Sequence, residues 1–166
     1  MKKGEKKLYK LTDEFGETMG KTRWVDSEGK VPKGGITNSI DPGITLKNPD
    51  LPLCSRGWIH AYESPLLAVL LNPKHSNFPP DKMRLFEARG IIGEREHQLK
   101  IGTRSLTTIR EIPIPQITPN QKTAFGILCV RGVEQSPTWN RWADNWLNGK
   151  DQIGRASCRE RVSSPV

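Results

Sequence analysis

The segment from Trp58 to Leu71 constrains the fold most, because an extended pattern runs directly into a helix start. The residues Trp58 to Tyr62 predict a short strand. Ser64 and Pro65 then supply an N-cap residue and a proline at the first helical position. The helix that follows stops before Pro73 and has almost no polar face, so we expect it to be buried on most sides.

Further strand patterns on both sides of this segment predict a sheet. Alternation over Leu8–Thr12, a turn at Glu14-Phe15-Gly16 and an extended piece over Thr22–Val25 predict a hairpin. Residues 26–53 are rich in glycine and proline and predict a long loop or flap. Additional strands are expected over Met83–Ala88, Gln98–Thr103 and Leu106–Ile114.

The C-terminal third predicts two helices. Thr118-Pro119-Asn120-Gln121 has the pattern of a capping box, and Ser136-Pro137 opens a second helix that Gly149 ends. The second helix carries Trp139, Trp142 and Trp146 on one face, which suits packing on the sheet or, alternatively, stacking of nucleic-acid bases. We therefore expect an α+β fold with an antiparallel or mixed sheet of about five or six strands, one buried central helix and two C-terminal helices.

The chain length of 166 residues fits one domain, which we place at residues 8–150. Residues 1–7 form a basic N-terminal tail in this prediction. Residues 151–166 have no periodicity and resemble translated adapter sequence from shotgun assemblies, so they are interpreted as non-native. The longest apolar run, Pro65–Leu71, is far shorter than the roughly 18 to 20 residues of a membrane span, and we expect a cytoplasmic protein.

The charge balance favours an anionic partner. The chain has 26 Lys and Arg against 18 Asp and Glu, a net charge of +8. Part of this excess is a run of lysines near the N-terminus, which we interpret as a solvated terminus. These lysines are Lys2, Lys3, Lys6, Lys7 and Lys10.

The cysteine and histidine spacings predict neither a disulfide framework nor a metal site. Cys54, Cys129 and Cys158 are widely separated, as are His60, His75 and His97. Phosphate-binding glycine loops and a nucleophile elbow are also absent from the sequence. We therefore predict no catalytic residue, no metal ligand and no cofactor.

Cationic and aromatic side chains around the central segment are the candidate ligand-binding residues. Arginine makes planar bidentate contacts with phosphate, and aromatic faces stack on bases. For Trp58 and His60 the alternative is that strand alternation points them into the core. For Arg104 the alternative is a solvated strand edge. The candidates are Arg56, Trp58, His60, Tyr62, Lys74, His75, Asn77, Lys100 and Arg104.

The same segment carries a family resemblance. The run Leu53-Cys54-Ser55-Arg56-Gly57-Trp58-Ile59-His60-Ala61-Tyr62-Glu63-Ser64-Pro65-Leu66, with Arg84-Leu85-Phe86-Glu87-Ala88 and Lys100-Ile101-Gly102, resembles an uncharacterised domain family frequent in bacteriophages and prophages. The resemblance covers about residues 8–112, and the Trp-rich end at 142–150 is similar to that of its closer members. It implies a phage protein that acts in the cytoplasm of an infected bacterium.

A second similarity concerns the order of elements over Gly57–Gly90, which looks like the middle of ADP-ribosyltransferase folds, where a helix borders the nicotinamide pocket. Glu87 and Glu111 are the candidates for the late glutamate of that group. The similarity favours a nucleotide-shaped pocket more than it favours catalysis.

These observations predict a phage-encoded, non-catalytic binding protein for an anionic nucleotide-like ligand, with sequestration of a host immune second messenger as its role. One alternative is an ADP-ribosyltransferase-like enzyme. Another is an antagonist that binds nucleic acid or a host defence protein, and a homo-oligomer is compatible with each reading.

Overall fold

The structure is a computed structural model that describes residues 3–47, 50–96, 99–134 and 136–150, without the side chains of residues 45–47, 73 and 74. The expected tail at 151–166 lies outside the described residues. Contacts divide the chain into two compact units, Met1–Gln116 and Ile117–Val166. The α+β class is confirmed, since helices and antiparallel sheets are both present.

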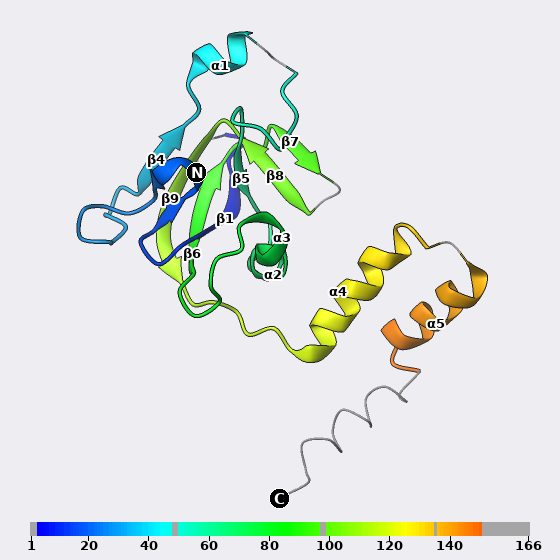
Figure 1. The fold of residues 1–166 in the computed structure, drawn as a ribbon. Helices are drawn as coiled ribbons and strands as arrows, with labels where there is room; N and C mark the ends of the chain where they lie inside the picture. Colours follow the sequence, from blue (N-terminus) through cyan, green and yellow to red (C-terminus); the bar gives the residue numbers. More distant parts are fainter. Residues whose placement is uncertain (1–2, 48–49, 97–98, 135, 151–166) are drawn as a thin grey trace, which may run out of the picture. The chain divides into compact units, whose positions relative to one another are not determined.

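The first unit is built on an antiparallel four-stranded sheet of order β1-β6-β9-β4 (Figure 1). Its register pairs Leu8 with Ala88 and Ile36 with Thr108, and a register shift follows Glu87. The strands are β1 (Lys6–Thr12), β4 (Ile36–Ser39), β6 (Arg84–Gly90) and β9 (Ser105–Ile112).

A three-stranded antiparallel sheet of order β5-β8-β7 is joined to the larger sheet at two points. Strand β8 continues into β9 with only Arg104 between them, and the carbonyl of Arg104 accepts a hydrogen bond from the Ile40 amide at 2.8 Å. Tyr9 and Tyr62 form an isolated antiparallel bridge with two backbone hydrogen bonds of 2.8 and 3.0 Å. The strands are β5 (Ile59–Ala61), β7 (Glu94–Glu96) and β8 (Lys100–Thr103).

Buried residues of both sheets belong to one apolar cluster, so the two sheets share a core. Trp24 is 1% exposed, and its carbonyl accepts a hydrogen bond from the buried Thr108 hydroxyl at 3.0 Å. The core residues are Leu8, Trp24, Ile59, Ala61, Ala88, Ile101 and Leu106.

The predicted hairpin between residues 8–12 and 22–25 is wrong in its pairing. Strand β1 pairs with β6, and the hairpin is a smaller one, in which β2 (Glu17–Thr18) pairs with β3 (Thr22–Arg23). A short 3-10 turn, η1 (Met19–Lys21), connects them, and both Gly20 and Lys21 have positive φ angles there. The alternation over Leu8–Thr12 predicts strand β1 correctly, but a strand pattern does not specify its partner.

The glycine- and proline-rich segment 26–53 is not a loop throughout. It contains β4 and the helix α1 (Pro42–Lys47). Strand β4 pairs with β9, where the Thr37 and Thr107 hydroxyls are 2.8 Å apart, as are those of Ser39 and Ser105. Only four residues of this segment alternate, so the strand has little sequence signal.

The predicted helix after Ser64 forms α2 (Pro65–Leu70), which packs on β1 (Figure 1). Within α2 only Ala68 is fully buried, so burial is less complete than its apolar composition predicts. The helix α3 (Asn72–His75) follows directly, since Pro73 occupies its first turn instead of ending the helical segment. The Asn72 side chain then holds the chain by two hydrogen bonds to the backbone of Phe78, of 2.8 and 3.0 Å.

The second unit is a pair of helices, α4 (Pro119–Arg131) and α5 (Pro137–Leu147). The predicted capping box at Thr118 is confirmed, since its side chain accepts from the Gln121 amide and Gln121 accepts from the Thr118 amide. Trp146 packs with Ile127 of α4, and Trp139 lies against the same cluster, whereas Trp142 is 43% exposed. None of the described helices has the length and apolar character needed to cross a membrane.

Candidate functional site

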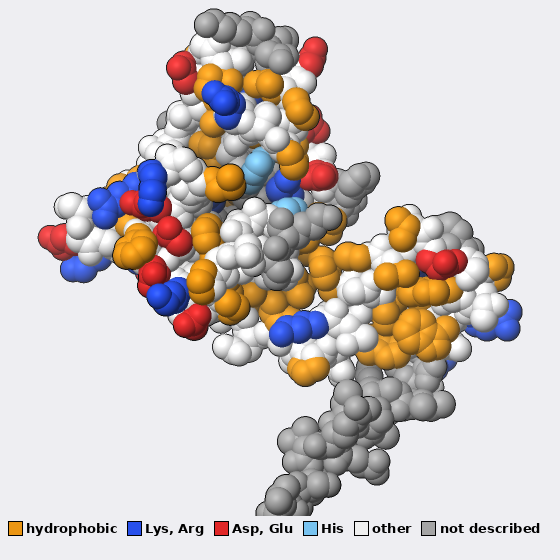
Figure 2. Space-filling model, in the orientation of Figure 1, with side chains coloured by type: hydrophobic (Ala, Val, Ile, Leu, Met, Phe, Trp, Pro, Cys, Tyr) orange, Lys and Arg blue, Asp and Glu red, His pale blue; other side chains and the backbone are white. Residues whose placement is uncertain are grey.

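A cavity of about 700 Å³ opens in the first unit, between β1, β5, β8 and the β2–β3 hairpin. In the space-filling view, histidine atoms are visible from outside in the middle of this unit, next to basic atoms (Figure 2). The lining residues are Lys10, Leu11, Thr18, Met19, Gly20, Thr22, Trp24, Ile40, Cys54, Ser55, Arg56, Trp58, Ile59, His60, Tyr62, His75, Ser76, Phe78 and Lys100.

The described residues of this wall are basic, aromatic, hydroxyl-bearing or apolar. It contains three Lys or Arg side chains, two histidines, several hydroxyl groups and four aromatic residues of other types, whereas none of the described residues that line it is Asp or Glu. Six of the nine predicted ligand-binding residues are among them, namely Arg56, Trp58, His60, Tyr62, His75 and Lys100. A wall of this composition favours an anion that also carries a flat ring.

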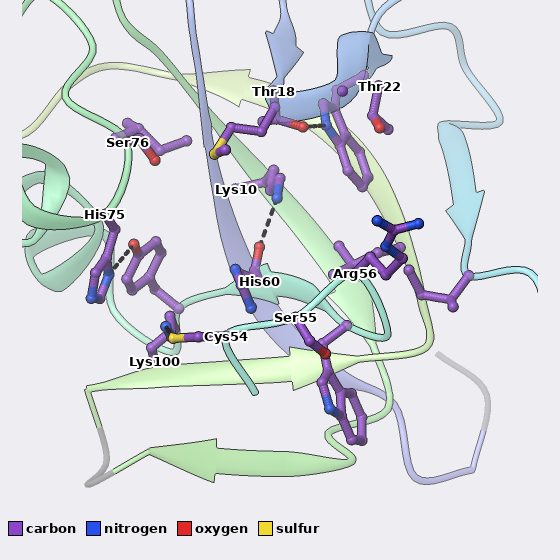
Figure 3. A pocket seen from close by; sticks show the side chains of 18 of the residues that line it. Lys10, Thr18, Thr22, Cys54, Ser55, Arg56, His60, His75, Ser76 and Lys100 are labelled. Atoms are coloured by element: carbon purple, nitrogen blue, oxygen red, sulfur yellow. Dashed lines mark hydrogen bonds between the residues drawn. The ribbon is translucent and has the colours of Figure 1, made fainter. Parts of the chain in front are cut away.

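Lys10 is the basic residue of the described lining that is not among the predicted candidates. The prediction of a solvated lysine run is wrong at this position, since Lys10 is only 8% exposed. Its Nζ donates to the carbonyl of His60 at 2.7 Å and lies 4.8 Å from the ring centroid of Trp24 (Figure 3). Burial lowers the pKa of Lys10 to about 7. The signal was present in the sequence, because alternation places Lys10 on the same face of β1 as the core residue Leu8.

His60, on strand β5, also lines the cavity. Its Nε2 lies 2.5 Å from the carbonyl oxygen of Leu53, so Nε2 is the protonated nitrogen and donates this bond. Burial lowers the pKa of His60, and the positive charges of Lys100 and Lys10 lower it further, against the opposing effect of the Leu53 carbonyl. The ring is therefore neutral near pH 7 and offers Nδ1 as an acceptor.

Tyr62 and His75 form a hydrogen-bonded pair on another side of the cavity. The Tyr62 hydroxyl is 2.9 Å from His75 Nδ1, and the two rings are stacked with centroids 6.1 Å apart. Burial raises the pKa of Tyr62 to about 12, so the phenol keeps its proton and can donate to Nδ1. The stacked pair is a flat surface at the cavity wall.

Lys100 is a buried cation that already has protein partners. Its Nζ donates to Cys54 Sγ at 2.9 Å and lies 3.1 Å from a carboxylate oxygen of Glu96. Burial alone would lower the pKa of Lys100, but the hydrogen bonds to Cys54 and Glu96 outweigh it and raise the pKa overall. Glu96 offsets part of the positive charge that Lys100 brings to the wall.

Arg104 does not line the cavity. Its guanidinium carbon lies 3.5 Å from the ring centroid of Trp58, and the group donates a hydrogen bond to the Gly57 carbonyl. Trp58 itself does line the cavity, and its Nε1 donates to the Leu51 carbonyl at 2.9 Å. Arg104 thus holds the loop before β5 and supports Trp58 from outside the cavity.

Trp58 fits only because two nearby residues have no side chain. A Cβ built on Gly93 would lie 2.6 Å from Cζ3 of Trp58, and one on Gly102 would lie 2.9 Å from Cε3. Both distances are too short for a real contact, so neither position accommodates alanine without movement of the ring.

The remaining candidate residues are arranged differently. Arg56 lines the cavity and is exposed, and among the described residues no ion-pair partner of Arg56 is found. Asn77 has a positive φ of 53° and is exposed, and it is not part of the lining. The Lys74 side chain lies outside the described part of the chain.

The two glutamates singled out for transferase chemistry are not at the cavity. Glu87 pairs with Lys7 at 3.0 Å and with Arg110 at 2.9 Å. Glu111 pairs with Arg84 at 2.5 Å. Within the described residues, no group of three metal-ligating side chains is present either.

No family model, curated protein or solved structure matches this chain. The functional proposal below therefore depends on the residues and the geometry of the cavity.

Proposed function

We propose that this protein binds a small anionic, nucleotide-like ligand in the cavity and does not transform it. The observation that carries the proposal is the composition of the wall, which combines cations and aromatic faces without a carboxylate among its described residues. A volume of about 700 Å³ suits such a ligand, because small-molecule sites fall within roughly 300 to 1,000 Å³.

Separate parts of the wall suit separate parts of a nucleotide. The exposed guanidinium of Arg56 is available for bidentate contacts with a phosphate. Trp58 and the stacked Tyr62–His75 pair offer faces to a base. Because Glu87 and Glu111 lie elsewhere in ion pairs, no observation favours the transferase alternative.

The biological part of the proposal rests on the bacteriophage resemblance. A protein that holds a nucleotide without consuming it would lower the free concentration of that nucleotide. We therefore extend the proposal to sequestration of a host immune second messenger in the cytoplasm of an infected bacterium.

A calorimetric and thermal-shift screen with cyclic dinucleotides, ADP-ribose derivatives and NAD tests the proposal. A bound ligand should stabilise the protein by about 2.7 kcal/mol at a hundredfold excess over Kd. Arg56→Ala should weaken binding about tenfold or more, whereas Arg141→Ala, at an exposed position of α5, serves as the matched control. Silence across the panel would refute binding, and conversion of labelled NAD to product would refute the non-catalytic part.

A further inference from the structure

Lys10 stands out in the cavity because nothing described near it neutralises its charge. Among the described residues, its Nζ donates to the His60 carbonyl and lies over the ring of Trp24. An ammonium ion has three donors, and neither a carbonyl dipole nor an aromatic ring supplies a full negative charge. Figure 3 shows this side chain reaching towards the middle of the cavity, between Thr18 and His60.

The charged groups on the elements around Lys10 already have other partners. On the β2–β3 hairpin, Glu17 is paired with Lys21 at 3.7 Å and with Arg23 at 4.0 Å. On β6, the register partner of Lys10 is the uncharged Phe86, and Arg84 further along is paired with Glu111. On β5, the pKa of the His60 ring is lowered by burial, and on β8, Lys100 is paired with Glu96.

The other titratable groups that line the cavity are Tyr62, His75, Cys54 and Arg56, and Cys54 accepts a hydrogen bond from Lys100 at 2.9 Å. Tyr62 keeps its proton, because burial raises its pKa to about 12.

We propose that the inner part of the cavity around Lys10 is a phosphate subsite, in which Lys10 binds a phosphate of the ligand as an ammonium ion and takes up a proton when it does so. The subsite rests on the proposed function and adds to it a residue, a chemical group and a coupled proton. Arg56 and Lys10 then have different roles. The exposed guanidinium of Arg56 attracts the anion, and the buried amine of Lys10 binds it where the surroundings are less polar.

The amount of proton uptake follows from the pKa of Lys10 before a phosphate binds. Since burial holds the pKa of Lys10 near 7, the amine is mostly neutral at pH 8. A bound phosphate restores the charged form, so binding should take up most of a proton at pH 8. Above pH 7.5 the affinity should fall about tenfold for each further pH unit.

The first experiment needs no variant and no nucleotide. The titration of the Lys10 amine is followed by NMR of lysine-labelled protein in sodium sulfate and in sodium chloride of equal ionic strength, with the signal assigned from its loss in Lys10→Arg. Sulfate does not titrate in this range and stands in for a phosphate. The midpoint should lie near pH 7 in chloride and rise by at least one pH unit in sulfate. A midpoint that sulfate leaves unmoved, or one equal to that of exposed lysines, overturns the subsite.

The second experiment separates this inference from the proposed function. ADP-ribose, whose two phosphates also do not titrate near neutral pH, is bound at pH 8 in buffers of different ionisation heat. The unmodified protein should take up most of a proton, and Lys10→Arg should bind without proton uptake. Binding without proton uptake in both proteins overturns the subsite and leaves the proposed function. A sulfate response with no nucleotide binding supports the subsite and removes the nucleotide proposal.

Discussion

Replacing Lys10 by methionine should stabilise the folded protein, and by an amount that depends on pH. Methionine has a similar length and no charge to desolvate. The fall of the Lys10 pKa from 10.5 to about 7 corresponds to about 4 to 5 kcal/mol, at 1.36 kcal/mol for each tenfold change in the acid constant. Loss of the hydrogen bond to His60 removes about 1 kcal/mol of this. A net gain of about 3 to 4 kcal/mol is expected below pH 7.

The sign of the pH dependence follows from proton binding in the two states. Lys10 has a lower pKa in the folded state than in the unfolded state, so the unfolded chain binds more protons between pH 7 and 10.5. The penalty is fully present below pH 7 and disappears as the pH rises towards 10.5. The advantage of methionine should therefore shrink by about 2 kcal/mol between pH 7 and pH 9.

Urea unfolding at pH 6.5, 7, 8 and 9, followed by tryptophan fluorescence and circular dichroism, measures this difference. Lys6→Met, at an exposed position of the same strand, is the matched control and should show a difference that is close to zero at every pH. If the difference between the unmodified protein and Lys10→Met is the same at pH 7 and pH 9, the amine is not desolvated in the folded state. The description of Lys10 as a buried amine with a lowered pKa would then be wrong.

Substitutions at four further positions test the contacts described above. Arg104→Ala should cost about 1 to 3 kcal/mol, because stacking on Trp58 and the bond to the Gly57 carbonyl are both lost; Arg104→Lys should recover less than half, and full recovery would exclude planar stacking as the cause. Thr118→Ala should cost about 1 kcal/mol and speed amide exchange in the first turn of α4, while unchanged exchange would contradict the capping box. Gly102→Ala should destabilise by about 1 to 3 kcal/mol in denaturation experiments, since its Cβ would meet Leu53 and Trp58. Gly126→Ala, an exposed helical position with open space, should instead stabilise by about 0.5 to 1 kcal/mol, and the same sign for both glycines would refute the contact argument.

Elements with a local signal could be predicted from the sequence. The capping box at Thr118 and the start of α5 after Ser136 are seen in the structure, because caps and prolines act within one helical turn. The strands around residues 8–12, 83–88 and 106–114 also form close to the expected ranges. In each case the information lies in consecutive residues.

Elements that depend on distant partners could not be predicted. Strand β4 has only four residues and is fixed by pairing with β9, about 70 residues away. The pairing of β1 with β6 rather than with a neighbouring strand is of the same kind. Residue types identified part of the cavity wall, since six of the nine candidates line it. The role of Lys10 depends on its burial, which comes from the strands and the hairpin around it.

The shape of the cavity wall at Trp58 depends on the absence of a side chain at Gly93 and at Gly102. Position 58 and positions 93 and 102 must then change together, because a large ring at one requires the absence of a side chain at the others. Gly93→Ala should cost much less in a Trp58→Leu background than alone, which a double-mutant cycle would measure as a favourable coupling. A variant with leucine at 58 and alanine at 93 would keep the strands and present the ligand with a different wall.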